Sequence, residues 1–237
     1  MDIYSSIFTR KSIRKFDMTP LSKETIGQIE TFISGLTPLL PDSKITHKIV
    51  GPECVKGMGL PKAPHFMLIY GREQPLRGVC AGFLFQQVEL YLYSMGLADR
   101  WLSTLKDKEG DPNFIAGFAF GKPAEPATRK LGEFDRKSVS EIAKGTDSRL
   151  EAVRLAPSGM NGQPWYFIAD GKAVHVFYKK SLGGVKGMLY HMTDIDVGLA
   201  LGHMAVASRH EGRNFTFIIK KKIPEAPKGF TYVGTVE

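Results

Sequence analysis

Cysteine is scarce in this chain of 237 residues, since only Cys54 and Cys80 occur, and they form neither a Cys-x-x-Cys pair nor a metal-like spacing. The sequence therefore contains no disulfide framework and indicates a reducing compartment. Long apolar runs are missing as well: the longest, such as Phe114 to Phe120, are far too short to cross a bilayer. Because no targeting segment is visible, we expect a cytoplasmic protein that does not use a membrane as partner.

Three common motifs are also absent, namely Gly-x-Gly-x-x-Gly, the P-loop and Gly-x-Ser-x-Gly. His191, Asp194 and Asp196 lie close together, but Thr193 and Asp196 are expected to cap the following helix, so no metal site is predicted. The net charge of +8 favours an anionic ligand. Its basic residues form short clusters without interleaved aromatics, so nucleic acid is not the expected partner; strongly salt-dependent binding to DNA or RNA would mark that alternative.

What is present is the composition of an ordinary globular protein, with 43% hydrophobic and 24% charged residues. The length fits one large domain or two small ones. Periodicity and capping residues predict an α+β protein. The predicted helices cover residues 2–8, 22–35, 78–95, 148–155 and 193–211, and the predicted strands cover residues 64–70, 114–120, 165–169, 173–178 and 215–220.

Two echoes indicate an internal duplication. Gly82 and Gly96 have the same spacing as Gly198 and Gly212, and a predicted strand follows each of these two helices. The run from Arg10 to Ile13 is also echoed by Arg-Lys-Ser-Val later in the chain. We therefore expect two similar α+β halves, residues 1–125 and 126–237, packed about a pseudo-two-fold axis as in a symmetric dimer.

The first group of residues suited to chemistry is a basic turn near the N-terminus. Arg10, Lys11, Ser12 and Arg14 place three cations and a hydroxyl within five positions. Arginine offers a planar fork to two phosphate oxygens, lysine adds a point charge, and serine adds a neutral donor. The turn is thus a candidate phosphate clamp, although an ordinary solvated basic turn is the alternative.

The second group is a polar loop between a helix and an aromatic strand. Its glycines let backbone approach a flat ligand, and its prolines stiffen both ends. Its amide side chains suit the polar edge of a flavin ring, whereas a proline-rich turn with capping groups is the alternative. The candidate binding residues are Pro157, Ser158, Gly159, Asn161 and Gln163.

The two groups together resemble the FMN-dependent nitroreductase family, through an Arg-x-Ser-x-Arg/Lys-x-Phe run and a Pro-Ser-x-x-Asn-x-Gln-Pro-Trp run. The resemblance implies a nitroreductase-like α+β fold and FMN as cofactor. In that family two subunits share each flavin: one subunit supplies the basic clamp and its partner supplies the loop.

The chain departs from the family pattern in one respect. Where the loop is expected in the first half, the sequence has Thr37 to Asp42 without the polar groups, and the intact loop stands in the second half. Conversely, the second-half echo of the clamp has Ser140 and Glu141 at the further basic positions. Each half thus keeps the complementary part of one site. This pattern indicates a fused, intrachain pseudo-dimer with a single flavin site, which is a monomer or at most a weak homodimer.

The resemblance implies further roles. The backbone at Leu102 and Ser103 would lie near flavin N5, and Arg136 and Lys137 resemble a late basic pair that reaches the phosphate, with exposed loop charges as the alternative. It also implies ping-pong hydride transfer from NAD(P)H through FMN to a nitroaromatic, quinone or similar acceptor. The flavin carries this chemistry, so no catalytic side chain is predicted. A degenerate member of the fold that has lost the flavin is the alternative.

Overall fold

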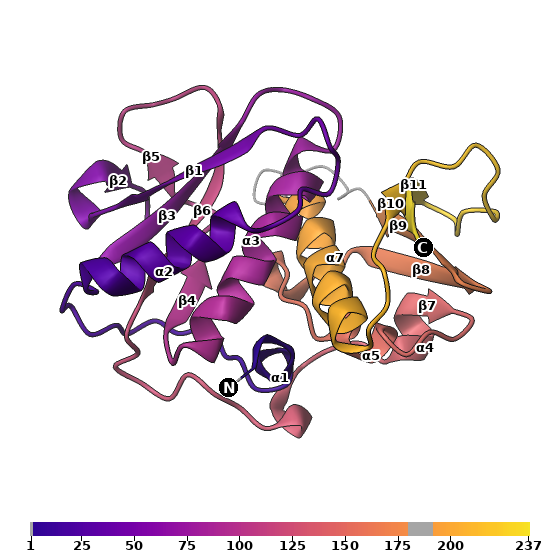
Figure 1. Ribbon diagram of the computed structural model, residues 1–237, viewed down its shortest axis with the longest axis horizontal. Helices are drawn as coiled ribbons and strands as arrows, with labels where there is room; N and C mark the ends of the chain where they lie inside the picture. The colour runs from indigo at the N-terminus through magenta and orange to yellow at the C-terminus, as the bar shows by residue number, and fades with distance from the viewer. Residues whose placement is uncertain (1, 180–191) are drawn as a thin grey trace.

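Two helices of equal length form the centre of the molecule. In the computed structural model, which describes residues 2–179 and 192–237, these are α3 (Arg77–Ser94) and α7 (Thr193–His210), each of 18 residues. Both are apolar on nearly every face, as helices buried between two layers are. Figure 1 shows them side by side, with one β-sheet on each flank. Within the described ranges, no helix has the length and apolar character needed to cross a membrane.

The first sheet has the strand order β1-β3-β6-β4, and every neighbouring pair is antiparallel. Helix α2 (Lys23–Ser34) packs on it through Ile29, and Ser22 caps this helix as predicted by accepting a hydrogen bond from the Thr25 N–H at 3.1 Å. The strands are β1 (Ile45–Val50), β3 (His65–Gly71), β4 (Ala98–Trp101) and β6 (Phe114–Gly121).

The second sheet has the order β10-β11-β9-β8-β7. Its pairs are antiparallel except for β7 with β8, which is parallel. From β8 onward the order β8-β9-β11-β10 matches β1-β3-β6-β4, and α7 follows β9 in the chain as α3 follows β3. The strands are β7 (Ala143–Lys144), β8 (Trp165–Asp170), β9 (Ala173–Lys179), β10 (Phe217–Ile218) and β11 (Phe230–Val236).

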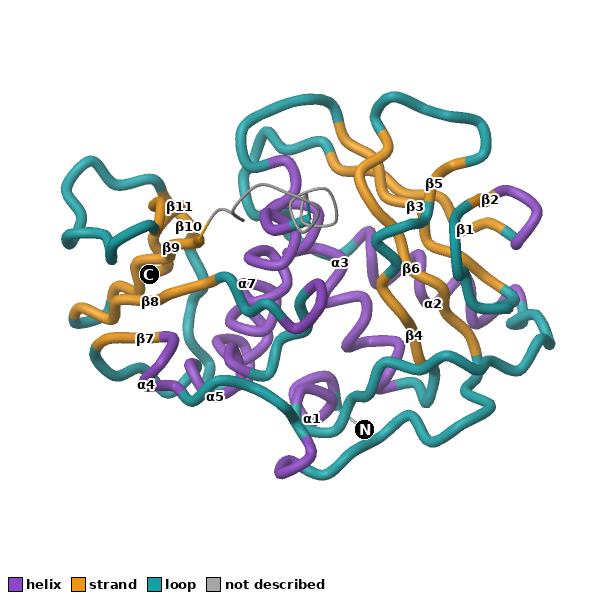
Figure 2. Tube along the Cα trace, turned by 180° about the vertical axis from the view of Figure 1, so that it is seen from behind, coloured by secondary structure: helices purple, strands orange, loops and turns teal. Residues whose placement is uncertain are grey.

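Short elements connect these layers. Figures 1 and 2 show a long connection that leaves the first sheet after β6, runs along one edge of the molecule past α1, and enters the second half at α4. Strands β2 and β5 form a small separate sheet. The short elements are α1 (Ile3–Ile7), η1 (Pro52–Cys54), β2 (Val55–Lys56), β5 (Lys106–Asp107), η2 (Leu131–Glu133), α4 (Val139–Ile142), α5 (Leu150–Arg154) and η3 (Gly159–Asn161).

The central helices touch at a pair of glycines. A Cβ atom placed on Gly82 would lie 2.2 Å from the Ile195 carbonyl oxygen and 3.0 Å from the Gly198 Cα. A Cβ on Gly198 would lie 2.8 Å from the Gly82 Cα and 2.2 Å from the Val79 carbonyl oxygen. Gly82 and Gly198 occupy the same position within their helices. The helices therefore meet backbone to backbone, at a distance that only glycine allows.

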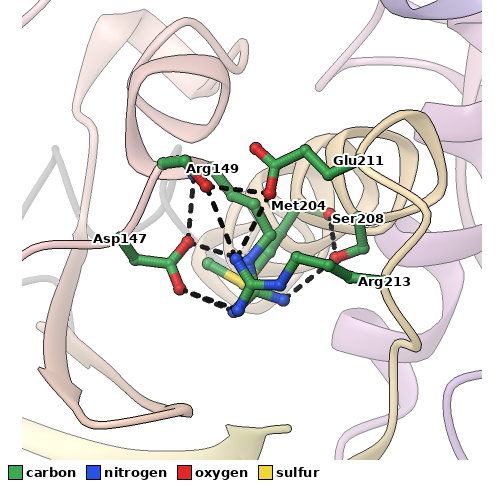
Figure 3. A network of polar contacts seen from close by, with 7 residues as sticks. Asp147, Arg149, Met204, Ser208, Glu211 and Arg213 are labelled. Atoms are coloured by element: carbon green, nitrogen blue, oxygen red, sulfur yellow. Dashed lines mark hydrogen bonds and ion pairs between the residues drawn. The ribbon is translucent and has the colours of Figure 1, made fainter.

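A buried ionic network fixes the C-terminal end of α7 to the chain before α5 (Figure 3). Arg149 is fully buried and pairs with Asp147 through Nε–Oδ1 at 2.8 Å and Nη2–Oδ2 at 2.8 Å. It also donates to the Ser208 hydroxyl of α7 at 3.0 Å. Arg213 reaches the same Asp147 at 3.3 Å and Glu211 at 3.2 Å. Since the arginine fork is matched by a carboxylate on two oxygens, its burial is compensated.

Candidate functional site

The N-terminal basic turn lies along β4. Isolated bridges join Arg10 to Thr128 and Phe16 to Pro123, so the turn pairs with the long connection between the sheets. On its other side, the Ile13 N–H donates to the Asp99 carbonyl of β4 at 3.3 Å. These backbone contacts hold the turn next to the strand that leads into Leu102.

Arg10 differs from the other residues of the turn because its side chain is buried. Only 1% of it is exposed, and its Nε lies 2.5 Å from Oε1 of Glu89 in α3. Its guanidinium also lies 5.8 Å from the centre of the Tyr93 ring. The sequence predicts this side chain as part of a phosphate clamp, and the structure pairs its guanidinium with the buried carboxylate of Glu89. Arg10 therefore anchors the turn to α3.

Lys11, Ser12 and Arg14 remain at the surface or half-buried. Their side chains make no hydrogen bond or ion pair within residues 2–179 and 192–237. The Glu125 carboxylate accepts hydrogen bonds from the backbone N–H groups of Arg14 and Lys15, and the first of these is the main cause of the lowered pKa of Glu125. Adjacent N–H groups that bind a carboxylate form an anion-binding concavity. The turn thus offers uncommitted cations beside a backbone that already binds an anion.

The polar loop of the second half has an unusual backbone. Met160, Asn161 and Gln163 have φ values of 50°, 57° and 46°, in the left-handed region that non-glycine residues rarely adopt. The Ser158 hydroxyl accepts the Gln163 N–H at 2.9 Å across the turn. Such conformations cost about 1–2 kcal/mol each and persist only where surrounding contacts impose them.

Arg136 and Lys137 supply these contacts. Arg136 donates through Nη1 to the Asn161 Oδ1 at 2.6 Å and through Nε to the Ala156 carbonyl at 3.1 Å. The Lys137 N–H donates to Oε1 of Gln163 at 2.8 Å, and its Nζ lies 3.3 Å from the Gln163 carbonyl oxygen. The structure thus brings the predicted late basic pair together with the predicted loop, and both amide side chains have protein partners.

A cluster of three arginines links the turn to the loop. Burial, followed by repulsion from Arg10 and Arg129, lowers the pKa of Arg136 to about 10. Arg129 also donates from Nε to the Arg10 carbonyl at 3.1 Å and lies 4.6 Å from the Phe134 ring centre. Sequence reasoning did not assign Arg129 to the site. The sequence places Arg129 in a basic cluster with Lys130, Arg136 and Lys137, and this pattern does not reveal which side chain points inward.

Asp196 anchors the loop to α7. Its Oδ1 accepts the Gly159 N–H at 2.9 Å, while its Oδ2 is buried without a hydrogen-bond partner in the described part of the chain. Burial raises the pKa of Asp196 to about 7. The sequence predicts Asp196 as a helix-capping residue with Thr193, and this is wrong: the residue at the N-cap position is Met192, which makes no side-chain capping bond. The carboxylate reaches across to the loop instead.

A cavity of about 610 Å³ lies at the N-terminal ends of α3 and α7. Leu102 and Ser103, predicted near the flavin, line it together with Leu76 to Gly78 of α3 and Met192 and Ile195 at the start of α7. Its lining does not include the basic turn or the loop. The turn is bonded to β4, which precedes Leu102 in the chain, and the loop is bonded to Asp196, which follows Ile195.

Residues 2–179 and 192–237 contain no group of three His, Cys, Asp or Glu side chains arranged to hold a metal ion. Of the cluster considered from the sequence, His191 lies outside the described residues.

Comparison with known proteins identifies the fold and the family. A solved structure described as a putative nitroreductase from Thermotoga maritima is 19% identical, with a TM-score of 0.70, over 100% of this chain and 92% of that protein. A nitroreductase family protein from Clostridium difficile is 15% identical with a TM-score of 0.47, over 60% of this chain and 96% of its own. A third structure, from Desulfovibrio desulfuricans, is described as a putative nitroreductase in complex with FMN; it is 16% identical with a TM-score of 0.46, over 60% of this chain and 94% of its own. No curated protein matches the chain.

The first of these likenesses spans the whole chain and shows that its fold is that of a nitroreductase. A family model described as "Putative TM nitroreductase" matches residues 2–208, which is most of the sequence. The chain therefore belongs to this nitroreductase family and is an oxidoreductase by class.

Proposed function

We propose that the chain binds one FMN and reduces a small nitroaromatic, quinone or similar acceptor at the expense of NAD(P)H. The observation that carries this proposal is the family match over residues 2–208, which contains both motifs of the FMN-dependent nitroreductases. Arg136, which binds Asn161 of the loop, lies close enough to Arg10 of the turn for the two charges to repel.

The donor set of the basic turn fits the phosphate of FMN. Lys11, Ser12 and Arg14 present an ammonium, a hydroxyl and a guanidinium that have no described protein partner, and phosphate is the group these donors bind best. Arg10 would not contact the phosphate itself; its ion pair with Glu89 would hold the turn on α3. The Leu102–Ser103 backbone would face the reactive edge of the ring, and the loop at Gly159 would meet its other side.

The bound FMN would supply hydride chemistry between the nicotinamide and the acceptor, in the ping-pong order of the family. The protein would position the ring and balance its charge. Arg129 and Arg136 place positive charge beside the loop, which favours an anionic ligand there. Exchange of nicotinamide and acceptor would take place in the 610 Å³ cavity beside Leu102 and Ser103.

We also infer that the chain is an intrachain pseudo-dimer, with halves at residues 1–125 and 126–237, and that it works as a monomer or weak homodimer. Three observations support this: the shared strand order, the equal length of α3 and α7, and the contact of Gly82 with Gly198. The turn then comes from one half and the loop from the other, as in a dimeric relative.

A non-catalytic protein that has lost flavin is the second candidate. It is favoured by the hydrogen bonds that occupy Asn161 and Gln163 and by the ion pair that occupies Arg10. Only the first candidate requires these side chains to share or release their present contacts when a ligand binds.

The test is a titration of the purified protein with FMN, followed by its quenched fluorescence, and then anaerobic addition of NADH or NADPH to the complex. We expect saturable quenching and bleaching of the visible flavin absorbance. A protein that leaves FMN fluorescence unchanged would refute the proposal and favour the non-catalytic candidate.

A matched pair of variants localises the phosphate. Lys11→Gln removes an exposed cation of the turn, and Lys172→Gln removes an exposed cation in the tight turn between β8 and β9. Loss of one charge-assisted contact should weaken FMN binding about tenfold in the first variant and leave the second unchanged. Equal affinities in both would exclude the turn as the phosphate site.

A further inference from the structure

A second cavity, of about 570 Å³, lies on the flank of the central helices next to the segment that follows α2. It shares no lining residue with the first cavity. One wall is formed by Gly35 to Leu39. The floor is formed by Phe83 and Gln87 of α3 with Ala205 and Arg209 of α7. The remaining side is closed by Arg213, Asn214, Phe215 and Phe217. Its volume is in the range of cavities that bind small molecules.

Matched positions of α3 and α7 carry different residues on the two sides of the helix pair. In α3, Glu89 and Tyr93 face the interior side on which Arg10 is buried. The residues at the same positions of α7 are Ala205 and Arg209, and these line the second cavity. On the first side, α1 and Arg10 cover the helix pair. On the second side, Ala205 stands at the position of Glu89. Its short side chain leaves open a space that corresponds to the one filled by Arg10 on the first side.

The lining of the cavity contains four phenylalanines and no acidic residue. Phe83 and Phe215 stack with ring centres 5.3 Å apart, and Phe32 and Phe217 add further aromatic surface. Such a wall suits the flat, apolar body of a ligand.

Arg209 gives the cavity its charge. Its Nη2 donates to the Gln87 Oε1 at 3.1 Å, and Gln87 is itself 2% exposed and held by the Phe83 carbonyl at 3.2 Å. Within the described residues Arg209 has no carboxylate partner. Arg213 differs, because Asp147 and Glu211 balance its charge. The buried Gln87 amide thus holds the guanidinium of Arg209, whose side chain is exposed, next to the phenylalanines of the lining.

We propose that this cavity binds a small aromatic carboxylate, with the carboxylate on Arg209 and the ring among the phenylalanines. A planar guanidinium pairs with a carboxylate through two parallel hydrogen bonds. The site does not depend on FMN, since it shares no residue with the proposed flavin site.

The test uses naphthalene-2-carboxylate as probe and naphthalene-2-carboxamide as its neutral match, measured by saturation-transfer NMR and calorimetry on the full chain. We expect the acid to bind more tightly than the amide, and Arg209→Gln to weaken the acid about tenfold while leaving the amide unchanged. Arg209→Lys keeps the charge and should retain most of the affinity. Arg72→Gln, at an exposed position outside the cavity, is the control.

Excess FMN separates this site from the proposed flavin site. Binding of the acid that persists with FMN present supports the proposal, and it does so even if the protein never binds FMN. Equal affinity for acid and amide, an Arg209→Gln variant that binds the acid as the unchanged protein does, or displacement of the acid by FMN would each overturn it.

Discussion

Replacing Gly82 with alanine should force the two central helices apart. The added Cβ would lie 2.2 Å from the Ile195 carbonyl oxygen, a backbone atom that cannot rotate away. The helices would have to separate by roughly 1 Å in an interior packed without spare room. Overpacking of this kind costs about 1–3 kcal/mol, and the better helix propensity of alanine returns about 1 kcal/mol. We therefore expect a net loss of up to about 2 kcal/mol in the free energy of unfolding, the upper end applying because the obstructing atom belongs to the backbone.

The control is Gly27→Ala in α2, where a Cβ would meet nothing within 4 Å. Only the propensity gain applies there, so this variant should be more stable by about 0.5–1 kcal/mol. Urea unfolding followed by circular dichroism measures both changes. If Gly82→Ala proved as stable as Gly27→Ala, the close contact of α3 with α7 and the role assigned to it would be wrong.

Three further predictions concern single side chains. Asp196→Asn should remove a pH dependence of the free energy of unfolding, because the folded pKa of Asp196, about 7, lies above the unfolded value. The aspartate lowers stability as the pH rises from about 4 to about 7, by roughly 4 kcal/mol at most. Urea unfolding at about pH 5 and about pH 8 measures this, and the same pH dependence in both proteins would contradict it. Glu125→Gln should tighten FMN binding about fivefold in a fluorescence titration, because a negative charge leaves the phosphate turn; weaker binding would show that Glu125 instead holds the turn in shape. Arg149→Met should lower the free energy of unfolding by about 3 kcal/mol, because it leaves the buried Asp147 with Arg213 as its only arginine partner among the described residues. The control Arg154→Met breaks the more exposed pair with Glu151 and should lower it by under about 1 kcal/mol in the same unfolding assay.

The long periodic elements could be predicted from the sequence because local signals agree there. The helix predicted at 78–95 is observed at 77–94, and Gly96 follows it with φ 77°, the left-handed conformation expected of a residue just past a helix end. Strands β1, β4 and β11 are not predicted from the sequence. His47 and Lys48 interrupt the apolar pattern of β1, and Gly234 interrupts that of β11, where its lack of a side chain makes room for the Phe217 ring. The strand predicted at 215–220 shrinks to Phe217–Ile218.

The site was predictable only as far as its motifs. The type and order of residues in the basic turn and in the loop indicate anion and ring binding before any fold is known. The ion-pair and hydrogen-bond partners of these side chains could not be predicted, because they lie far away in the sequence. Glu89 lies in a helix whose sequence is almost uniformly apolar, yet it pairs with Arg10 of the turn. Asp196 binds the N–H of Gly159, 37 residues away in the sequence, instead of capping its own helix. Local pattern cannot distinguish a carboxylate that caps from one that reaches a distant loop.

The matched positions of α3 and α7 have an evolutionary consequence. In an assembly of identical subunits, one codon specifies both faces of the central helix pair, so a change that improves one face is imposed on the other. Here Tyr93 and Arg209 stand at the same helical position but are encoded separately, and one covers a buried arginine while the other lines a cavity. Each face can therefore be selected independently for a different ligand.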